Sequence, residues 1–104
     1  MKFDYPYTVP REEVRVRLEA LGDYLYNRHG IRIEWASDDK VRFSGKYLVV
    51  TVEGEMTIDD GVVHFRGKDP GMLWRKKAMQ YLQGKLGAYL DPNTPPASLP
   101  RDKQ

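Results

Sequence analysis

The sequence predicts an α+β fold with two layers: a curved antiparallel sheet and two helices packed on one of its faces, in the order β-α-β-β-β-β-α. Two segments, 8–30 and 72–90, repeat apolar residues at the helical spacing of three and four. Between them, residues 31–66 alternate apolar and polar side chains and are interrupted by turn residues, as in strands joined by short hairpins. Because the sheet has one apolar face and each helix one apolar stripe, a small helix-grip-like packing around one core is expected.

The first strand and the first helix are predicted over residues 2–30. Residues 2–7 alternate weakly, and Pro6 indicates an edge strand or an extended lead-in. Thr8 is the expected N-cap of the helix, with Pro10 in its first turn and Gly30 directly after its end. The apolar stripe consists of Val14, Leu18, Leu21 and Leu25.

Four strands are expected between the two helices. Residues 31–37 alternate cleanly, residues 41–44 resume the pattern, and Asp59-Asp60-Gly61 is a strong hairpin signal. Gly54 interrupts the inner face of the longest strand, where a glycine is typical of a bend in a curved sheet. The inner face of that strand is expected to carry Leu48, Val50, Val52, Met56 and Ile58.

The second helix is expected over residues 72–90, after the breaker Gly67-Lys68-Asp69-Pro70-Gly71. Its stripe is Met79, Leu82, Leu86 and Leu90, and Gly84 and Gly87 lower its intrinsic propensity by roughly 1 kcal/mol each. Residues 91–104 hold four of the seven prolines and little apolar surface. The sequence therefore predicts one α+β domain over residues 1–91 and a disordered, Pro-rich tail over residues 92–104.

Composition excludes several classes of chemistry. The chain has 104 residues and no cysteine, so disulfides and thiolate zinc sites are ruled out. No further metal ligand follows His29 or His64 three or four residues later, and the outward pair Glu53 and Glu55 is typical of a solvated strand face. We expect no catalytic residues, no metal and no cofactor, and hence no enzyme.

The sequence also bears on location. No run approaches 18 apolar residues, so no transmembrane segment is predicted. The N-terminus lacks the apolar stretch of a signal peptide, so a cytoplasmic protein is expected.

Positive charge is concentrated around the start of the second helix. The net charge of the chain is only +2, yet residues 66–85 carry six basic groups against Asp69 alone. Basic residues beside an aromatic side chain at a helix start suit an anionic or amphiphilic surface, although an ordinary solvated helix face gives the same pattern. The candidate surface or partner-binding residues are Arg66, Lys68, Trp74, Arg75, Lys76, Lys77 and Lys85.

The pattern as a whole resembles the family of putative polyhydroxyalkanoic acid system proteins, small bacterial proteins associated with the gene regions of polyester storage granules. The resemblance runs from about Tyr5 to Leu90. It is carried by the helix that contains Pro10-Arg11-Glu12-Glu13-Val14-Arg15-Val16-Arg17-Leu18, by Tyr24-Leu25-Tyr26-Asn27-Arg28-His29-Gly30 with the strand Ile31-Arg32-Ile33-Glu34-Trp35, and by Val41-Arg42-Phe43-Ser44-Gly45. The segment 67–77 is more polar than the Leu-rich segment usual in the family, and the Pro-rich tail is an addition.

The resemblance implies a non-enzymatic accessory or binding protein, associated with polyhydroxyalkanoate granules and partnered by the granule surface or an acidic protein. Two alternatives come from the residues. A sheet gripped by its last helix could carry a small apolar ligand, although the number of apolar side chains is about what one core requires. The 66–85 segment could instead bind nucleic acid or an acidic partner, but the low net charge disfavours nucleic acid.

Overall fold

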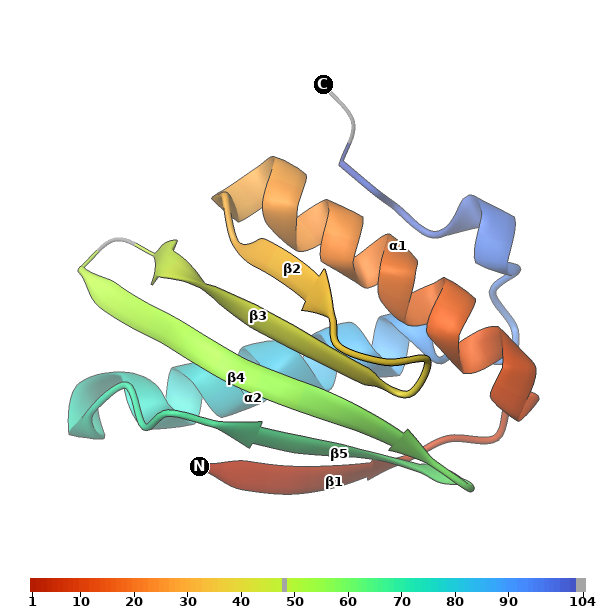
Figure 1. Cartoon of the computed structure of the whole chain (residues 1–104), viewed down its shortest axis with the longest axis horizontal. Coiled ribbons are helices and arrows are strands. Elements are labelled where there is room, and N and C mark those ends of the chain that lie inside the picture. The colour runs from red at the N-terminus through yellow and green to blue at the C-terminus, as the bar shows by residue number, and fades with distance from the viewer. Residues whose placement is uncertain (48, 103–104) are drawn as a thin grey trace.

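Five antiparallel strands form a single sheet in the computed structural model, which describes residues 1–47 and 49–102 (Figure 1). The strands lie in the order β1-β5-β4-β3-β2, so the last four form a meander and β1 joins beside β5. The elements are β1 (Lys2–Pro6), α1 (Arg11–His29), β2 (Arg32–Trp35), β3 (Lys40–Tyr47), β4 (Val50–Asp59), β5 (Val62–Gly67), α2 (Met72–Tyr89) and a short 3₁₀ helix, η1 (Pro96–Ser98). The predicted α+β class and element order are confirmed. The inner-face prediction for Leu48 lies outside the described residues.

Both ends of α1 have identifiable causes. The helix begins one residue after Pro10, whose carbonyl accepts a hydrogen bond of 2.9 Å from the amide of Glu13, so the prediction of Thr8 as N-cap is wrong. Proline fits this position because its fixed φ suits a helix entry and it has no N–H to leave unpaired. The helix ends where Gly30 adopts a left-handed φ of 71°, as expected for the residue after a helix.

One hydrophobic core lies between the sheet and the two helices. The same cluster contains the stripe of α1, inward residues of the strands, and Leu82 and Leu86 of α2, so both helices cover the same sheet face (Figure 1). Val14, Val63 and Leu86 are completely buried at its centre. The two predicted layers are therefore present.

Two glycines face each other in the sheet. Gly54 of β4 pairs with Gly67 of β5, and each is covered by a phenyl ring from its own or a neighbouring strand. A Cβ atom at Gly54 would lie 3.1 Å from Cζ of Phe43, and one at Gly67 would lie 2.7 Å from Cζ of Phe65. Two large rings thus take the space that two side chains would need, and a glycine at each position allows this close packing.

Helix α2 is anchored along its second half. Its buried side chains are Leu82, Leu86 and Tyr89, whereas the first turns carry none. Met79, which belongs to the predicted stripe, is half-buried and lies outside the core. The first half of α2 therefore leans over the sheet without being packed into it.

The C-terminal segment differs from the disordered tail that the sequence predicts. Residues 92–102 run back along α1 (Figure 1), and Leu99 belongs to the core with 5% of its surface exposed. The hydroxyl of Tyr89 donates to the carbonyl of Pro100, and the side-chain amide of Asn27 donates to the carbonyl of Arg101 at 2.9 Å. One leucine and a few backbone carbonyls provide this docking, and composition alone does not signal them.

Candidate functional site

The predicted basic residues do not form one patch. Arg66 lies on the outer sheet face, whereas Lys85 stacks on α1 with its Nζ 4.0 Å from the ring centroid of Tyr24. Arg75 pairs with Asp69 at 2.7 Å, and Lys76 is exposed on α2. Three candidates, Lys68, Trp74 and Lys77, meet at a cavity under the first half of α2.

That cavity lies between the inner face of the sheet and α2 and has a volume of about 480 Å³. Its walls are largely hydrocarbon and aromatic, and they come from α1, β3, β4, β5 and α2, with residues from the N-terminus and from the loops before β2 and α2. The apolar lining is Met1, Leu25, Ile31, Phe43, Tyr47, Val50, Val52, Phe65, Pro70, Trp74, Ala78, Tyr81 and Leu82. A concave, mainly apolar hollow with few polar groups is typical of small-molecule sites, which span about 300–1,000 Å³.

The polar residues at this cavity come from α1, α2, β4 and the loop before α2. Nζ of Lys77 lies 5.9 Å from the ring centroid of Trp74, and Lys68, Thr51 and Glu53 border the cavity. On α1, Nε2 of His29 lies 3.0 Å from the hydroxyl oxygen of Tyr81. Burial lowers the pKa of His29, and the neighbouring cations Arg28 and Lys85 lower it further, whereas burial raises the pKa of Tyr81 to about 12.

Next to the cavity, two adjacent apolar residues are left uncovered at the start of α2. Met72 and Leu73 expose 85% and 86% of their surfaces, and Val49 in the β3–β4 turn exposes 85%. The turn and the start of α2 lie at the same end of the molecule, on the left in Figure 1. We call Val49, Met72 and Leu73 the apolar tip.

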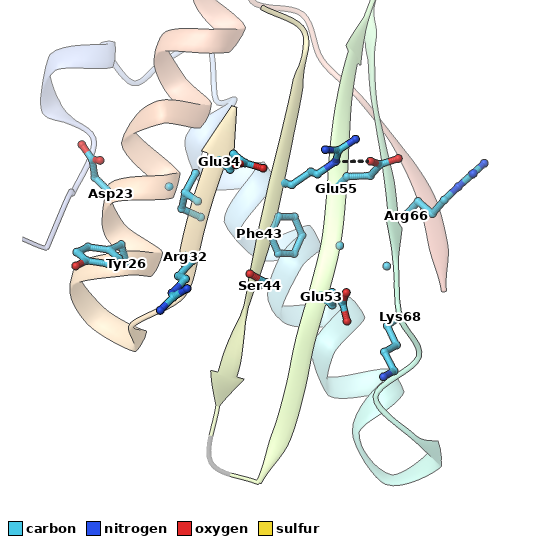
Figure 2. A pocket seen from close by; sticks show the side chains of 15 residues that line it. Asp23, Tyr26, Arg32, Glu34, Phe43, Ser44, Glu53, Glu55, Arg66 and Lys68 are labelled. Atoms are coloured by element: carbon cyan, nitrogen blue, oxygen red, sulfur yellow. Dashed lines mark ion pairs between the residues drawn. The ribbon is translucent and has the colours of Figure 1, made fainter. Parts of the chain in front are cut away.

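A second and larger hollow, of about 1070 Å³, lies on the outer sheet face beside α1 (Figure 2). Its floor includes a row of alternating charges across neighbouring strands, formed by Glu34, Arg42, Glu55 and Arg66. Nε of Arg42 lies 3.6 Å from the carboxylate of Glu55, the ion pair dashed in Figure 2. Opposite charges that face each other across strands stabilise a sheet.

The outer face also holds the other residues weighed from the sequence. Glu53 and Glu55 both line this outer hollow, and Glu55 is the partner of Arg42. Nδ1 of His64 lies 2.6 Å from the carboxylate of Asp4, and this hydrogen bond raises the pKa of the imidazole. Glu53 and Glu55 therefore lie on a solvated strand face.

The exposure of the apolar tip is the feature that sequence reasoning missed, whereas a cavity under the last helix was kept open as an alternative. Met72 and Leu73 read as the opening of an amphipathic helix, and the sequence does not show that the first half of α2 lacks packing partners. In the sequence, the cavity is indicated only by Trp74 and Tyr81, two aromatic residues that fall on the same face of the second helix as Ala78.

Across the described residues, no helix combines the length and the apolar character needed to cross a membrane.

The comparisons with known proteins agree with the resemblance seen in the sequence. A family model described as "Putative polyhydroxyalkanoic acid system protein" matches residues 2–93, which include the five strands, both long helices and the whole cavity lining except Met1. Comparisons with curated proteins and with solved structures found no match. Since the family model covers most of the 104 residues, the chain belongs to the family of putative polyhydroxyalkanoic acid system proteins.

Proposed function

We propose that this protein is a non-enzymatic accessory protein of the cytoplasm that attaches to the surface of polyhydroxyalkanoate storage granules through its apolar tip. The observation that carries this proposal is the exposure of Met72 and Leu73, two consecutive large apolar residues at the start of a long helix. The family description supplies the polyhydroxyalkanoic acid system as the setting.

The chemistry of the tip suits a polyester surface. Burying a methionine or leucine side chain against an apolar phase contributes about 1.5–3 kcal/mol, so two of them provide useful binding free energy. Lys68 and Lys76 are exposed near the tip. A polyester of hydroxy acids ends in a carboxyl group, so these cations add attraction at the granule surface.

A binding role is also supported by the positions of the titratable side chains, which are spread over both sides of the sheet. The imidazoles of His29 and His64 lie on opposite sides of the sheet, beside Tyr81 and Asp4 respectively. Glu55 is paired with Arg42 on the outer face, away from the cavity. General acid–base chemistry needs such groups to converge on one substrate position, and His29, His64 and Glu55 do not.

The test is co-sedimentation of the purified full chain with protein-stripped polyhydroxybutyrate granules. The double variant Met72→Ser/Leu73→Ser should lose more than tenfold in affinity, because about 3 kcal/mol of apolar burial is removed. The matched control is Val16→Ser/Tyr26→Ser, which changes two exposed apolar residues of α1.

The control variant should bind like the wild type, and both variants should keep its melting temperature within a few degrees. Equal binding by all three proteins, or no binding by the wild type, would refute the proposal.

A second candidate function is the carriage of a small apolar ligand. The observation that favours it is the 480 Å³ cavity, which the sequence did not lead us to expect at this size. The cavity and the apolar tip lie at the same end of the molecule, so an accessory protein at the granule surface could hold a ligand there.

A further inference from the structure

We infer that the 480 Å³ cavity binds the hydrocarbon chain of a fatty acid anion, with the carboxylate at the cavity mouth beside Lys77. This inference deepens the second candidate function and rests on it. It does not depend on attachment to granules.

The wall chemistry restricts the enclosed part of the ligand to hydrocarbon. Within the described chain, Arg17 is the one charged side chain that is buried, and its guanidinium is taken up by carbonyls at the end of α2. A ligand carbonyl or hydroxyl deep in the cavity would lose its water and meet aliphatic groups such as those of Leu25, Ile31 and Val52. Burying such a group without a partner costs about 1–3 kcal/mol. An alkyl chain has no such groups.

The charges at the cavity favour an anionic end on that chain. Lys68 and Lys77 both line the cavity, and Lys77 lies over Trp74. Arg75 on the same helix is already paired with Asp69, so it is committed elsewhere. Glu53 and Lys68 also border the cavity, but Figure 2 shows both side chains at the hollow on the outer face of the sheet, so the assignment rests on Lys77.

The other titratable groups at the cavity do not oppose a carboxylate. His29 and Tyr81 form a hydrogen-bonded pair, and together they present a neutral surface near pH 7. A carboxylate at the mouth would thus meet the ammonium group of Lys77 on one side and a neutral aromatic wall on the other. A cationic head group would be repelled by the same lysine.

The packing of α2 gives the chain a way in. The second half of the helix is fixed by Leu82, Leu86 and Tyr89, whereas no side chain of its first turns is buried. A ligand can therefore enter beneath Trp74 and Ala78 without displacing the core.

The first experiment measures binding of octanoate, decanoate and dodecanoate below their micellar concentrations. Trp74 lines the cavity, so its fluorescence reports occupancy in a Trp35→Phe background that removes the other tryptophan. The affinity should rise about fourfold for each added methylene, the increment expected when one CH₂ group leaves water. An affinity that does not change with chain length would overturn the inference.

The second experiment tests the head group. Lys77→Gln should weaken dodecanoate binding by about twofold to fivefold and leave the neutral analogue dodecanol unchanged, since one exposed charge pair is lost. Lys76→Gln, on an exposed neighbouring position, is the matched control and should change neither. Dodecyltrimethylammonium should bind more weakly than dodecanoate.

The possible results distinguish a failure of the fatty-acid inference from a failure of the carrier function or of granule attachment. Binding of dodecanol as tight as dodecanoate would overturn the carboxylate assignment and keep the carrier function, whereas no binding by any chain would overturn both.

Ala78→Phe, which fills the cavity, should abolish binding. Undiminished binding by that variant at an unchanged melting temperature would indicate surface adsorption and overturn the inference. Met72→Ser/Leu73→Ser should bind dodecanoate like the wild type even if it no longer binds granules.

Discussion

Arg17 of α1 closes the end of α2: its Nη1 lies 3.1 Å from the carbonyl oxygen of Tyr89. The same nitrogen lies 3.1 Å from the carbonyl oxygen of Asp91, and Nη2 lies 3.2 Å from the carboxylate of Glu13. Only 2% of the surface of Arg17 is exposed. The last carbonyls of a helix have no partner within the helix, and a cation there also suits the helix dipole. This contact fixes one end of α2 and leaves the other end, with the apolar tip, free for binding.

Replacing Arg17 with methionine should therefore destabilise the protein by about 2–4 kcal/mol. The variant keeps much of the side-chain volume but leaves the buried carbonyls of Tyr89 and Asp91 without their donor. Arg28→Met is the matched control, because Arg28 is exposed and pairs with Asp102 at 3.6 Å; its effect should stay below about 0.5 kcal/mol. Urea denaturation measures both, and equal effects would show that the carbonyl contacts of Arg17 contribute little.

The two glycines inside α2 should respond differently to alanine. A Cβ atom at Gly84 meets nothing within 4 Å, so Gly84→Ala should stabilise the protein by about 0.5–1 kcal/mol through helix propensity. A Cβ atom at Gly87 would lie 3.1 Å from the hydroxyl oxygen of Tyr5, so Gly87→Ala should gain less or lose stability. Thermal melts of the two variants test this, and the reverse order would contradict the close approach of α2 to β1.

The docked C-terminal segment should contribute to stability. Leu99→Ala removes a buried side chain and should cost about 2–4 kcal/mol, and deletion of residues 93–104 should cost at least as much. Ser98→Ala, on an exposed neighbour whose hydroxyl bonds only to Pro95, is the control. Unchanged melting temperatures for Leu99→Ala and for the deletion would instead support the disorder predicted from composition.

The two histidines should give stability an opposite dependence on pH. The pKa of His29 is lowered by burial from 6.5, so the folded chain binds this proton less readily, and stability is lost as the pH falls below that value. The pKa of His64 is raised by Asp4, so its stabilisation is full below 6.5 and is lost as the pH rises through the folded value.

Melts at about pH 5.5 and 7.5 test the two signs. His29→Gln should remove a loss of stability on the acidic side, and His64→Asn should remove a gain there. A pH dependence identical to that of the wild type in both variants would contradict these assignments.

Local signals in the sequence predicted most of the fold. Periodicity placed both helices within three residues of their observed ends, and the hairpin at Asp59-Asp60-Gly61 contains the left-handed Gly61, with a φ of 73°. Such features depend on a few neighbouring residues, and so they can be read from the chain. The pairing of β1 with β5 joins the first strand to the last, far apart in the sequence, and no local pattern predicts it.

The features that could not be predicted depend on what lies opposite each residue. Met79 has the spacing of a core residue, yet it lies outside the core because the first half of α2 lacks packing partners. Leu99 lies in a proline-rich segment of the sequence, yet its side chain is buried in the core. The exposure of Met72 and the cavity beneath Trp74 are likewise properties of packing, and periodicity reports only that a residue is apolar.

The most direct test of the account is photo-crosslinking of the granule-bound protein. A photoreactive phenylalanine analogue replaces Leu73 in the apolar tip or, as the control, the exposed Tyr26 of α1. If the tip contacts the polyester, position 73 should become covalently attached to polyhydroxybutyrate on irradiation, and position 26 should not. Attachment at position 26 with none at position 73, or equal attachment at both, would contradict the central claim that this end of the molecule binds the granule.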